Sequence, residues 1–384
     1  KYYNQDVVIT TKITERFLDM ENKLIYTING TTMTLGELLS RKAEFGISSI
    51  VVEYGADGSV GEERSDDSTS TVTITFHDDG EYTISAQVSD YAGNQSAPTQ
   101  TDTFVVDQTK PVASVAYYSY GTGQTFAPGT AANAPYYLNQ NYSSFKAVVS
   151  VTELNFEKDG NVNTNLTIGA TNSGNKTTDE MTSFINTHGA NVKSAQNWSD
   201  PSGITRTYTV DVTADANYSF DFNYTDLAGN ELEVAVPTAY VTLDRVVPSG
   251  EIIVNGFVNG VDGNNNATQK SWFEKFISAI TFNLFGKDSV NASMKSSDVT
   301  SGMASTQYIA TSTLLSKAQL AARTDWRDYT GNIHLAANEN VIVYEKVTDR
   351  AGNTEYYSTE NIVVDNVDPA PEVTITPSAP AWGK

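Results

Sequence analysis

Cysteine, basic residues and histidine are absent or scarce in this chain, and each shortage excludes a class of function. With no Cys in 384 residues, disulfide bonds, thiol catalysis and cysteine-ligated zinc are excluded. Lys and Arg total 24 against 46 for Asp and Glu, so the net charge is −22 and a polyanion such as DNA would be repelled. The three histidines, His77, His188 and His334, lack the short spacing that places two metal ligands on one face. We therefore expect no nucleic-acid partner and no histidine-based metal or catalytic centre.

Long apolar runs and catalytic motifs are also missing. No apolar stretch approaches the 18 residues that a membrane helix needs, so no membrane insertion is expected in this segment. GxSxG, P-loop and GxGxxG patterns do not occur, which leaves nucleophilic and nucleotide chemistry without support. Adjacent carboxylates such as Asp66 with Asp67 and Asp179 with Glu180 are expected to be solvated surface groups rather than a glycosidase pair. The sequence thus favours a protein that is not an enzyme.

The residues that are abundant indicate β-structure and several domains. Tyr occurs 21 times while charged residues make up only 18% of the chain, a composition typical of β-rich extracellular proteins. The length predicts two to four domains.

A repeated pair of motifs divides the chain. DYAGN at 90–94, DLAGN at 226–230 and DRAGN at 349–353 each follow a strand-like run. A second motif ends in a proline 16 to 18 residues after the end of each DxAGN tract, at Pro111, Pro248 and Pro369. Each pair predicts a hairpin with glycine at positive φ in its turn, followed by a proline that ends the pairing.

The openings of the units repeat as well. YYNQ at 2–5 precedes a strand that ends at Glu15, and YYLNQ at 136–140 precedes one that ends at Glu153. The strand-like run at 112–120 has no counterpart after Lys1, so we expect the chain to lie inside a longer array. The predicted domains are listed here: 1–110, 111–247 and 248–369, with 370–384 a tail or the start of a further repeat.

Short runs with period-two alternation predict half-buried strands, and each unit adds one capped helix. The capping boxes are Thr34 with Glu37, Thr177 with Glu180 and Ser316 with Gln319. Tyr82 and Tyr218 each lie eight residues before a DxAGN aspartate, where a tyrosine corner of an immunoglobulin-like sandwich would lie, with Ile84 and Phe220 in the core. The predicted fold is all-β: three tandem immunoglobulin-like β-sandwiches, each with a short helical insertion.

These motifs resemble the bacterial Ig-like repeats of wall-attached surface proteins of Gram-positive bacteria. Such repeats read roughly YYN, ITExNF, Trp, DGxY, DxAGN and FxVDxTxP. The second unit matches them most closely, with YYLN, VTELNFE from Val151, Trp198, NYSF, DLAGN and VTLDRVVP. The first unit departs from the pattern at Phe17 and Leu18 and has no Trp.

The third unit resembles a sister repeat type, with Trp272, Asp298, Gly302 and Trp326 as its markers. The resemblance implies a non-catalytic segment of a bacterial adhesin, extracellular and attached to the wall through parts outside this chain. It implies a host extracellular protein as partner, with immunoglobulin, captured in a superantigen-like way, as the named candidate. The alternatives are a carbohydrate or mucin-glycan-binding module and a pure spacer in a surface stalk.

No cofactor is expected apart from calcium. Asp90, Asn94 and the downstream Asp107 offer hard oxygen ligands near a domain junction. The same Asx residues also stabilise turns without any metal, and no dense DxDxD spacing is present. Both interpretations stay open from the sequence.

Candidate partner-binding residues cluster in the first two units, where an interface would need apolar anchors on protruding elements. The Gly- and Pro-rich stretch at 117–137 would present large rings on a flexible tip, and the helical segments at 34–45 and 177–188 would protrude. In the opposing interpretation the helices close the sandwich ends and the outer tyrosines belong to strands. The candidate residues are Arg41, Lys42, Tyr118, Tyr120, Phe126 and Phe184.

Overall fold

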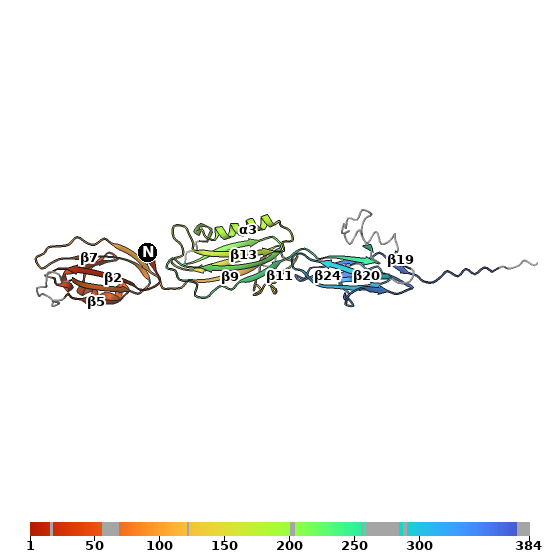
Figure 1. Cartoon of the computed structure of the whole chain (residues 1–384), viewed down its shortest axis with the longest axis horizontal. Helices are drawn as coiled ribbons and strands as arrows, with labels where there is room; N and C mark the ends of the chain where they lie inside the picture. The colour runs from red at the N-terminus through yellow and green to blue at the C-terminus, as the bar shows by residue number, and fades with distance from the viewer. Residues whose placement is uncertain are drawn as a thin grey trace, which may run out of the picture.

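The computed structural model describes residues 1–15, 18–55, 69–120, 123–199, 204–254, 257–258, 284–286 and 290–374. Within these ranges the chain forms pairs of β-sheets that follow one another along its longest axis (Figure 1). The predicted all-β, immunoglobulin-like fold class is confirmed. We call residues 1–110, 111–247 and 248–369 the first, second and third units. Asp66, Asp67, Phe17 and Trp272 lie outside the described residues.

The first unit pairs a five-stranded sheet with a three-stranded one. The larger sheet has the order β1 (Tyr2–Tyr3), β8 (Asp102–Val106), β7 (Gly80–Val88), β3 (Leu24–Ile28) and β4 (Thr31–Thr34). The smaller sheet has the order β2 (Val7–Thr14), β6 (Thr69–Phe76) and β5 (Ile47–Glu53).

The second unit is the most regular, with two four-stranded sheets. One has the order β10 (Thr125–Phe126), β9 (Val112–Tyr120), β12 (Ser144–Thr152) and β14 (Thr205–Val212). The other has the order β11 (Tyr136–Leu138), β16 (Ala239–Leu243), β15 (Ala216–Tyr224) and β13 (Thr164–Thr171).

The third unit repeats this plan with a larger second sheet. Its first sheet has the order β18 (Phe257–Val258), β17 (Ser249–Val254), β20 (Val290–Ser297) and β23 (Ile333–Leu335). Its second sheet contains β19 (Leu284–Gly286), β26 (Ile362–Val364), β24 (Glu339–Asp349), β21 (Met303–Thr311) and β22 (Arg327–Asp328), with β25 (Thr354–Ser358) paired to β24.

The predicted strand alternation produces the cores. On β12 every second residue is buried, and on β6 the buried positions are Ser70, Val72, Ile74 and Phe76. The predicted core residues Ile84 and Phe220 are buried between the sheets of their units. Since side chains alternate across a pleated strand, the period-two pattern places one set in the core and the other in solvent.

All three predicted capping boxes form. Thr34 caps α2 (Leu35–Arg41), Thr177 caps α3 (Thr178–Asn191) and Ser316 caps α5 (Lys317–Ala321). The described ranges also contain three shorter helical segments, α1 (Met20–Lys23), η1 (Lys42–Phe45) and η2 (Ala195–Asn197). No helix in the described ranges combines the length and apolar character that crossing a bilayer demands.

The two tyrosine corners are also confirmed. The Tyr82 hydroxyl donates to the carbonyl of Asp78 at 2.7 Å, and the Tyr218 hydroxyl donates to the carbonyl of Ala214 at 2.7 Å. Each bond runs four residues back along the chain, so the short sequence spacing was sufficient to predict it.

Candidate functional site

The three DxAGN turns share one hydrogen-bonded geometry. In the second unit, the Asp226 carboxylate accepts hydrogen bonds from the backbone N–H and the side-chain amide of Asn230, each at 2.8 Å. Asp349 with Asn353 and Asp90 with Asn94 make the same pair of bonds. The turn glycine has a φ of 90° to 93° in each copy, as predicted. These bonds fix the turns without a metal ion.

Two of the turns also fasten their unit to the one before it. The amide nitrogen of Asn230 donates to the backbone carbonyls of Asp107 at 2.7 Å and Thr109 at 3.4 Å. The amide nitrogen of Asn353 likewise donates to the carbonyls of Asp244 at 2.9 Å and Val246 at 3.3 Å. We call these two contact regions the first and second joints. Both asparagines are buried, so these bonds are shielded from water.

Three carboxylates meet at the first joint, one from each of three separate elements. Asp107 follows β8, Glu153 follows β12 and Asp226 belongs to the turn after β15, and their carboxylate oxygens lie within 4.8 Å of one another. All three side chains are at most 4% exposed. Asn155 donates its side-chain amide to Asp107 and its backbone N–H to Glu153, each at 2.7 Å. We call this group the first triad.

The second joint holds the corresponding group, Asp244, Asp298 and Asp349, also within 4.8 Å of one another. Backbone N–H groups hydrogen-bond two of these carboxylates and offset part of the cost of burying them. Ser301 donates to Asp244 at 3.1 Å and Gly302 donates to Asp298 at 2.7 Å. We call this group the second triad. The recurrence follows from the repeated motifs, because Asp244 and Asp349 occupy the positions of Asp107 and Asp226.

Burial and mutual repulsion disfavour the fully ionised state of both triads. Burial, reinforced by the charges of Asp107 and Asp226, raises the pKa of Glu153 to about 7. At the second joint, burial and the charges of Asp298 and Asp349 raise the pKa of Asp244 to about 6. Burial likewise raises the pKa of Asp107 and of Asp349. A proton or a cation at either triad would relieve this repulsion.

The donor set of each triad suits a hard divalent cation. Three carboxylates offer up to six oxygens, which is the ligand type and number that Ca²⁺ takes, and no softer ligand is present. Asp107 and Glu153 also border a cavity of about 610 Å³, which gives the first triad access from solvent. Within the described residues, the groups that could hold an ion are therefore the members of the two triads.

The structure separates the residues that the sequence grouped as calcium ligands. Asp90 and Asn94 bond to each other at one end of β7, whereas Asp107 lies at the other end, where Gly80 pairs with Val106. Nine strand residues lie between them, about 30 Å of extended chain. Asp107 instead meets Glu153 and Asp226. The repeated DxAGN motif could have predicted this grouping from the sequence, if the turn of each unit had been paired with the end of the preceding unit.

The candidate binding residues of the first unit lie on or beside α2. Arg41 is exposed and forms an ion pair with Glu44 at 2.8 Å, with its guanidinium 5.6 Å from the Phe45 ring centre. Lys42 is half-buried and donates to the carbonyl of Ser48 at 2.8 Å. Both cations are therefore already engaged within their own unit.

Phe126 and Phe184 pack inward, which differs from the expected flexible tip at 117–137 and protruding helix at 177–188. Phe126 lies in β10 and stacks on Tyr136 with ring centres 4.5 Å apart, and it also packs against the core. Phe184, on α3, packs against the same core beside His188. Because both rings are half-buried, they contribute to the packing of the sandwich and leave little surface for contact with a partner.

Tyr118 and Tyr120 face solvent on the β9 strand. The Lys146 ammonium lies 5.1 Å from the Tyr118 ring centre and 5.8 Å from that of Tyr120. Tyr120 is 42% exposed and its hydroxyl donates to Asp211 at 3.2 Å. Together these side chains form an ordered polar and aromatic surface, which we call the tyrosine face: Tyr118, Tyr120, Lys146 and Asp211.

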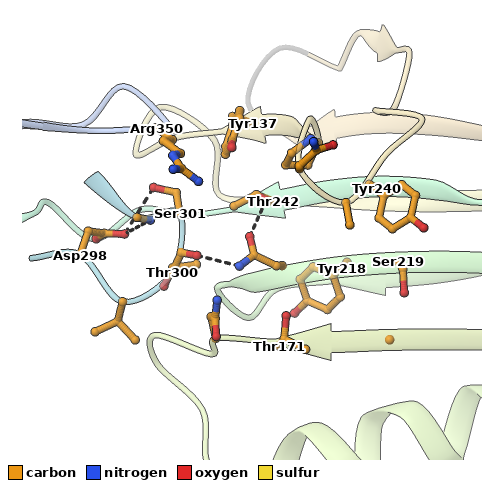
Figure 2. Close-up of a pocket in the computed structure, with 18 residues that line it drawn as sticks. Tyr137, Thr171, Tyr218, Ser219, Tyr240, Thr242, Asp298, Thr300, Ser301 and Arg350 are labelled. Atoms are coloured by element: carbon orange, nitrogen blue, oxygen red, sulfur yellow. Dashed lines mark hydrogen bonds between the residues drawn. The ribbon is translucent and has the colours of Figure 1, made fainter. Parts of the chain in front are cut away.

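A cavity of about 510 Å³ lies at the second joint between the second and third units (Figure 2). Asn217 bridges the units there, donating to the carbonyl of Thr300 at 2.7 Å and accepting from the Thr242 hydroxyl at 2.6 Å. Figure 2 shows Tyr137 and Arg350 at the same cavity, with Tyr240 further along its wall. Its lining of hydroxyl, amide, ring and guanidinium groups suits a polar ligand.

Comparison with known families and curated proteins finds no match. Among solved structures, Bacteroides ovatus SGBP-B of the mixed-linkage glucan utilization locus is similar at 12% identity and a TM-score of 0.15, over 94% of this chain and 72% of that one. A 1.5-MDa bacterial ice-binding adhesin is similar at 13% identity and a TM-score of 0.22, over 94% and 92%. The S-layer protein rSbsC is similar at 12% identity and 0.18, over 98% and 55%. None of these three names is that of an enzyme, and at these TM-scores the likenesses carry no functional argument.

Proposed function

We propose that this chain is a non-catalytic segment of an extracellular bacterial surface protein, in which it serves as an extended stalk with fixed joints. One observation carries the proposal: Asn230 and Asn353 are buried and each binds two backbone carbonyls of the preceding unit. Domains joined only by a flexible linker move relative to one another. Here the linker carbonyls are bonded to the next unit, which supports a fixed relative orientation.

Small-angle X-ray scattering tests the stalk directly. A compact globule of 384 residues would have a radius of gyration of about 21 Å. We expect a clearly larger value and a scattering profile typical of a rod. A radius near that of the globule would contradict the proposed function.

A second function, capture of a host extracellular protein, is favoured by the tyrosine face. Tyrosine rings held in place by a neighbouring cation lose little conformational entropy when they bind, which makes them good interface anchors. The named candidate remains immunoglobulin, the partner that the sequence resemblance implies. Parts of the protein outside this chain would attach it to the cell wall.

A pull-down with purified immunoglobulin tests this second function. We expect the intact chain to capture it and the Tyr118→Ala, Tyr120→Ala double variant to lose capture. Tyr91→Ala is the matched control, because it removes an exposed tyrosine ring elsewhere on the chain and should leave capture intact. Equal capture by both variants would contradict the assignment to the tyrosine face.

Carbohydrate binding is the alternative supported by the cavity at the second joint. Tyr137, Tyr240, Asn217 and Arg350 line it and could stack on and hydrogen-bond a sugar. A glycan array that responds to the intact chain but not to Arg350→Ala would support this alternative. If the chain binds neither a glycan on the array nor immunoglobulin in the pull-down, it serves as a spacer alone.

A further inference from the structure

The cavity at the second joint is lined by two units rather than one (Figure 2). The second unit supplies Tyr137 on β11, Tyr240 on β16 and Asn172 just after β13. The third unit supplies residues 298–302 and Arg350. The volume of about 510 Å³ is in the range of small-molecule sites. Because both units contribute walls, the cavity has this form only when the joint holds them in this orientation.

The wall from the second unit is held in place by backbone hydrogen bonds. Gly129 exchanges two of them with Tyr240, each at 2.9 Å, which ties the loop after β10 to β16. The loop then turns on itself, with the N–H of Ala134 donating to the carbonyl of Ala131 at 3.0 Å. A Cβ atom at Gly129 would collide with the carbonyl of Ala134, so this close turn requires glycine. The loop places Asn133 at the cavity.

The wall from the third unit is equally fixed. The N–H of Gly302 closes a loop by donating to the Asp298 carboxylate at 2.7 Å. The side-chain amide of Asn217 donates from the second unit to the carbonyl of Thr300 in this loop at 2.7 Å. The N–H of Arg350 donates to the carbonyl of Gly302 at 2.9 Å. A ligand would therefore meet two walls that are already ordered, which lowers the entropy cost of binding.

The side chains that line this space offer hydrogen-bond donors, acceptors and ring faces. The guanidinium of Arg350 is exposed, has only N–H donors and is in no ion pair within the described residues. The amides of Asn133 and Asn172 are exposed and can both donate and accept. The rings of Tyr137 and Tyr240 are half-buried. This set suits a sugar, whose hydroxyls both donate and accept and whose C–H groups pack against an aromatic face.

Charge decides which kind of sugar fits. Arg350 and Asp298 are the charged residues among the described residues that line the cavity. Asp298 belongs to the second triad, in which the carboxylate oxygens of Asp244 and Asp349 lie within 4.8 Å of its own. One guanidinium is thus outnumbered by three acidic groups, and the whole chain has a net charge of −22. A sialylated or sulfated glycan would be repelled, whereas a neutral one would not.

We propose that the cavity at the second joint binds a neutral oligosaccharide, with both units contacting the same sugar chain. This inference rests on the carbohydrate alternative above, and it adds the class of sugar and the part played by the joint. Tyr137 and Tyr240 pack against the C–H faces of the sugar rings, while Arg350 and Asn133 bond to hydroxyls from opposite units. A bound sugar therefore bridges the two units and stabilises the orientation of the joint.

The state of the joint should in turn control the affinity for the sugar. Asn353 does not line the cavity, but it binds the carbonyls of Asp244 and Val246 and so fixes the orientation of the third unit. If this joint is loosened, only a fraction of the molecules present the complete cavity, and the apparent affinity falls in proportion to that fraction. By reciprocity, the sugar favours the fixed joint to the same extent. Asn230 makes the equivalent contacts at the first joint and provides a matched control.

A panel of defined sugars tests the class of ligand. Lactose, N-acetyllactosamine, maltohexaose and cellohexaose serve as neutral probes, and sialyllactose and sulfated N-acetyllactosamine serve as acidic ones. We expect the full chain to bind at least one neutral probe in isothermal titration calorimetry, and to bind both acidic probes several-fold more weakly. An acidic probe that binds as tightly as the neutral ones would overturn the inference while leaving carbohydrate binding in place. Binding to none of the probes would overturn both.

Variants on the two walls show whether this cavity is the site. Arg350→Ala and Asn133→Ala, one in each unit, should both weaken binding, Arg350→Ala by about tenfold or more because a charged donor is lost. Arg327→Ala is the matched control, since it removes an exposed arginine of the third unit that does not line the cavity. The melting temperature of each variant shows whether it is folded. Unchanged affinity in both folded wall variants would place the sugar elsewhere and overturn the site.

Loosening one joint at a time tests the coupling. Asn353→Ala should lower the affinity for the neutral probe several-fold, whereas Asn230→Ala should leave it unchanged. Saturating sugar should also narrow the distribution of molecular dimensions that scattering shows for Asn353→Ala, but not that for Asn230→Ala. If Asn353→Ala binds as tightly as the unmodified chain, or if both variants lose affinity equally, the two units do not share the site and the inference is wrong.

Discussion

The side-chain amide of Asn230 donates one hydrogen to the carbonyl of Asp107, 2.7 Å away in space and 123 residues earlier in the chain. The same amide donates to the carboxylate of Asp226 in its own turn at 2.8 Å. A single side chain thus closes the turn of one unit and holds the linker of the unit before it. Asn353 repeats the arrangement with Asp349 and Asp244. The conformation of the turn and the orientation of the joint are therefore linked.

Removing this amide should loosen a joint while leaving each sandwich folded. We expect Asn230→Ala to cost about 1 to 3 kcal/mol at the first joint, because two buried carbonyls lose their donor. Scattering should then show a broader distribution of molecular dimensions. Asn94→Ala is the matched control, since Asn94 is exposed and bonds only within its own turn in the described residues. An Asn230→Ala profile identical to that of the control would contradict a joint held by this residue.

The pKa of Glu153 predicts how stability depends on pH in the absence of divalent metal. Its folded pKa of about 7 is above its usual value of 4.5, so between these values the folded state binds more protons than the unfolded state. In EDTA, stability should therefore fall as the pH rises from about 4.5 to 7, by up to about 3 kcal/mol at 1.36 kcal/mol per pKa unit. Chemical denaturation across this range measures the loss. Glu153→Gln should reduce the dependence of the unfolding free energy on pH. If that dependence is unchanged in the variant, groups other than Glu153 cause the loss of stability.

Calcium should reverse the same loss at neutral and alkaline pH. An ion at either triad offsets the repulsion among three carboxylates and stabilises the state that binds it. We expect the melting temperature at pH 8 to rise on adding Ca²⁺ and to fall again with EDTA. Asp226→Asn should reduce the rise, whereas Asp90→Asn, at the exposed turn, should preserve it. If Ca²⁺ does not change the melting temperature, the triads do not bind the ion, and the DxAGN aspartates act only through the hydrogen bonds of their turns.

The tyrosine corners should contribute similar, modest stability in the first two units. Tyr218→Phe and Tyr82→Phe each remove one hydroxyl that donates to a backbone carbonyl at 2.7 Å. We expect each variant to lose about 1 kcal/mol of unfolding free energy. Tyr91→Phe, at an exposed position, should be neutral in the same denaturation experiment. Losses at Tyr91 equal to those at the corners would show that the hydroxyl bonds contribute nothing specific.

The sequence alone was sufficient wherever an interaction spans only a few residues. The capping box of Thr34 with Glu37 and the corner bond of Tyr82 with Asp78 join residues three and four positions apart. The turn glycines are equally local, since positive φ is a property of one residue. Period-two alternation predicted the sandwiches because a pleated strand sends successive side chains to opposite faces.

Only the tertiary structure decided which residues form the joints. Sequence spacing grouped Asp107 with Asp90, but the rigid length of β7 keeps them at opposite ends of the first unit. Asp107 meets Asp226 because the units stack end to end, and an aspartate pair 119 positions apart carries no local signal of that contact. The inward packing of Phe126 against Tyr136 was hidden for the same reason, since it depends on how β10 folds back over the core. The sequence by itself determined the turns, caps and strands through short-range geometry, while the carboxylate triads and the two joints arise from long-range packing.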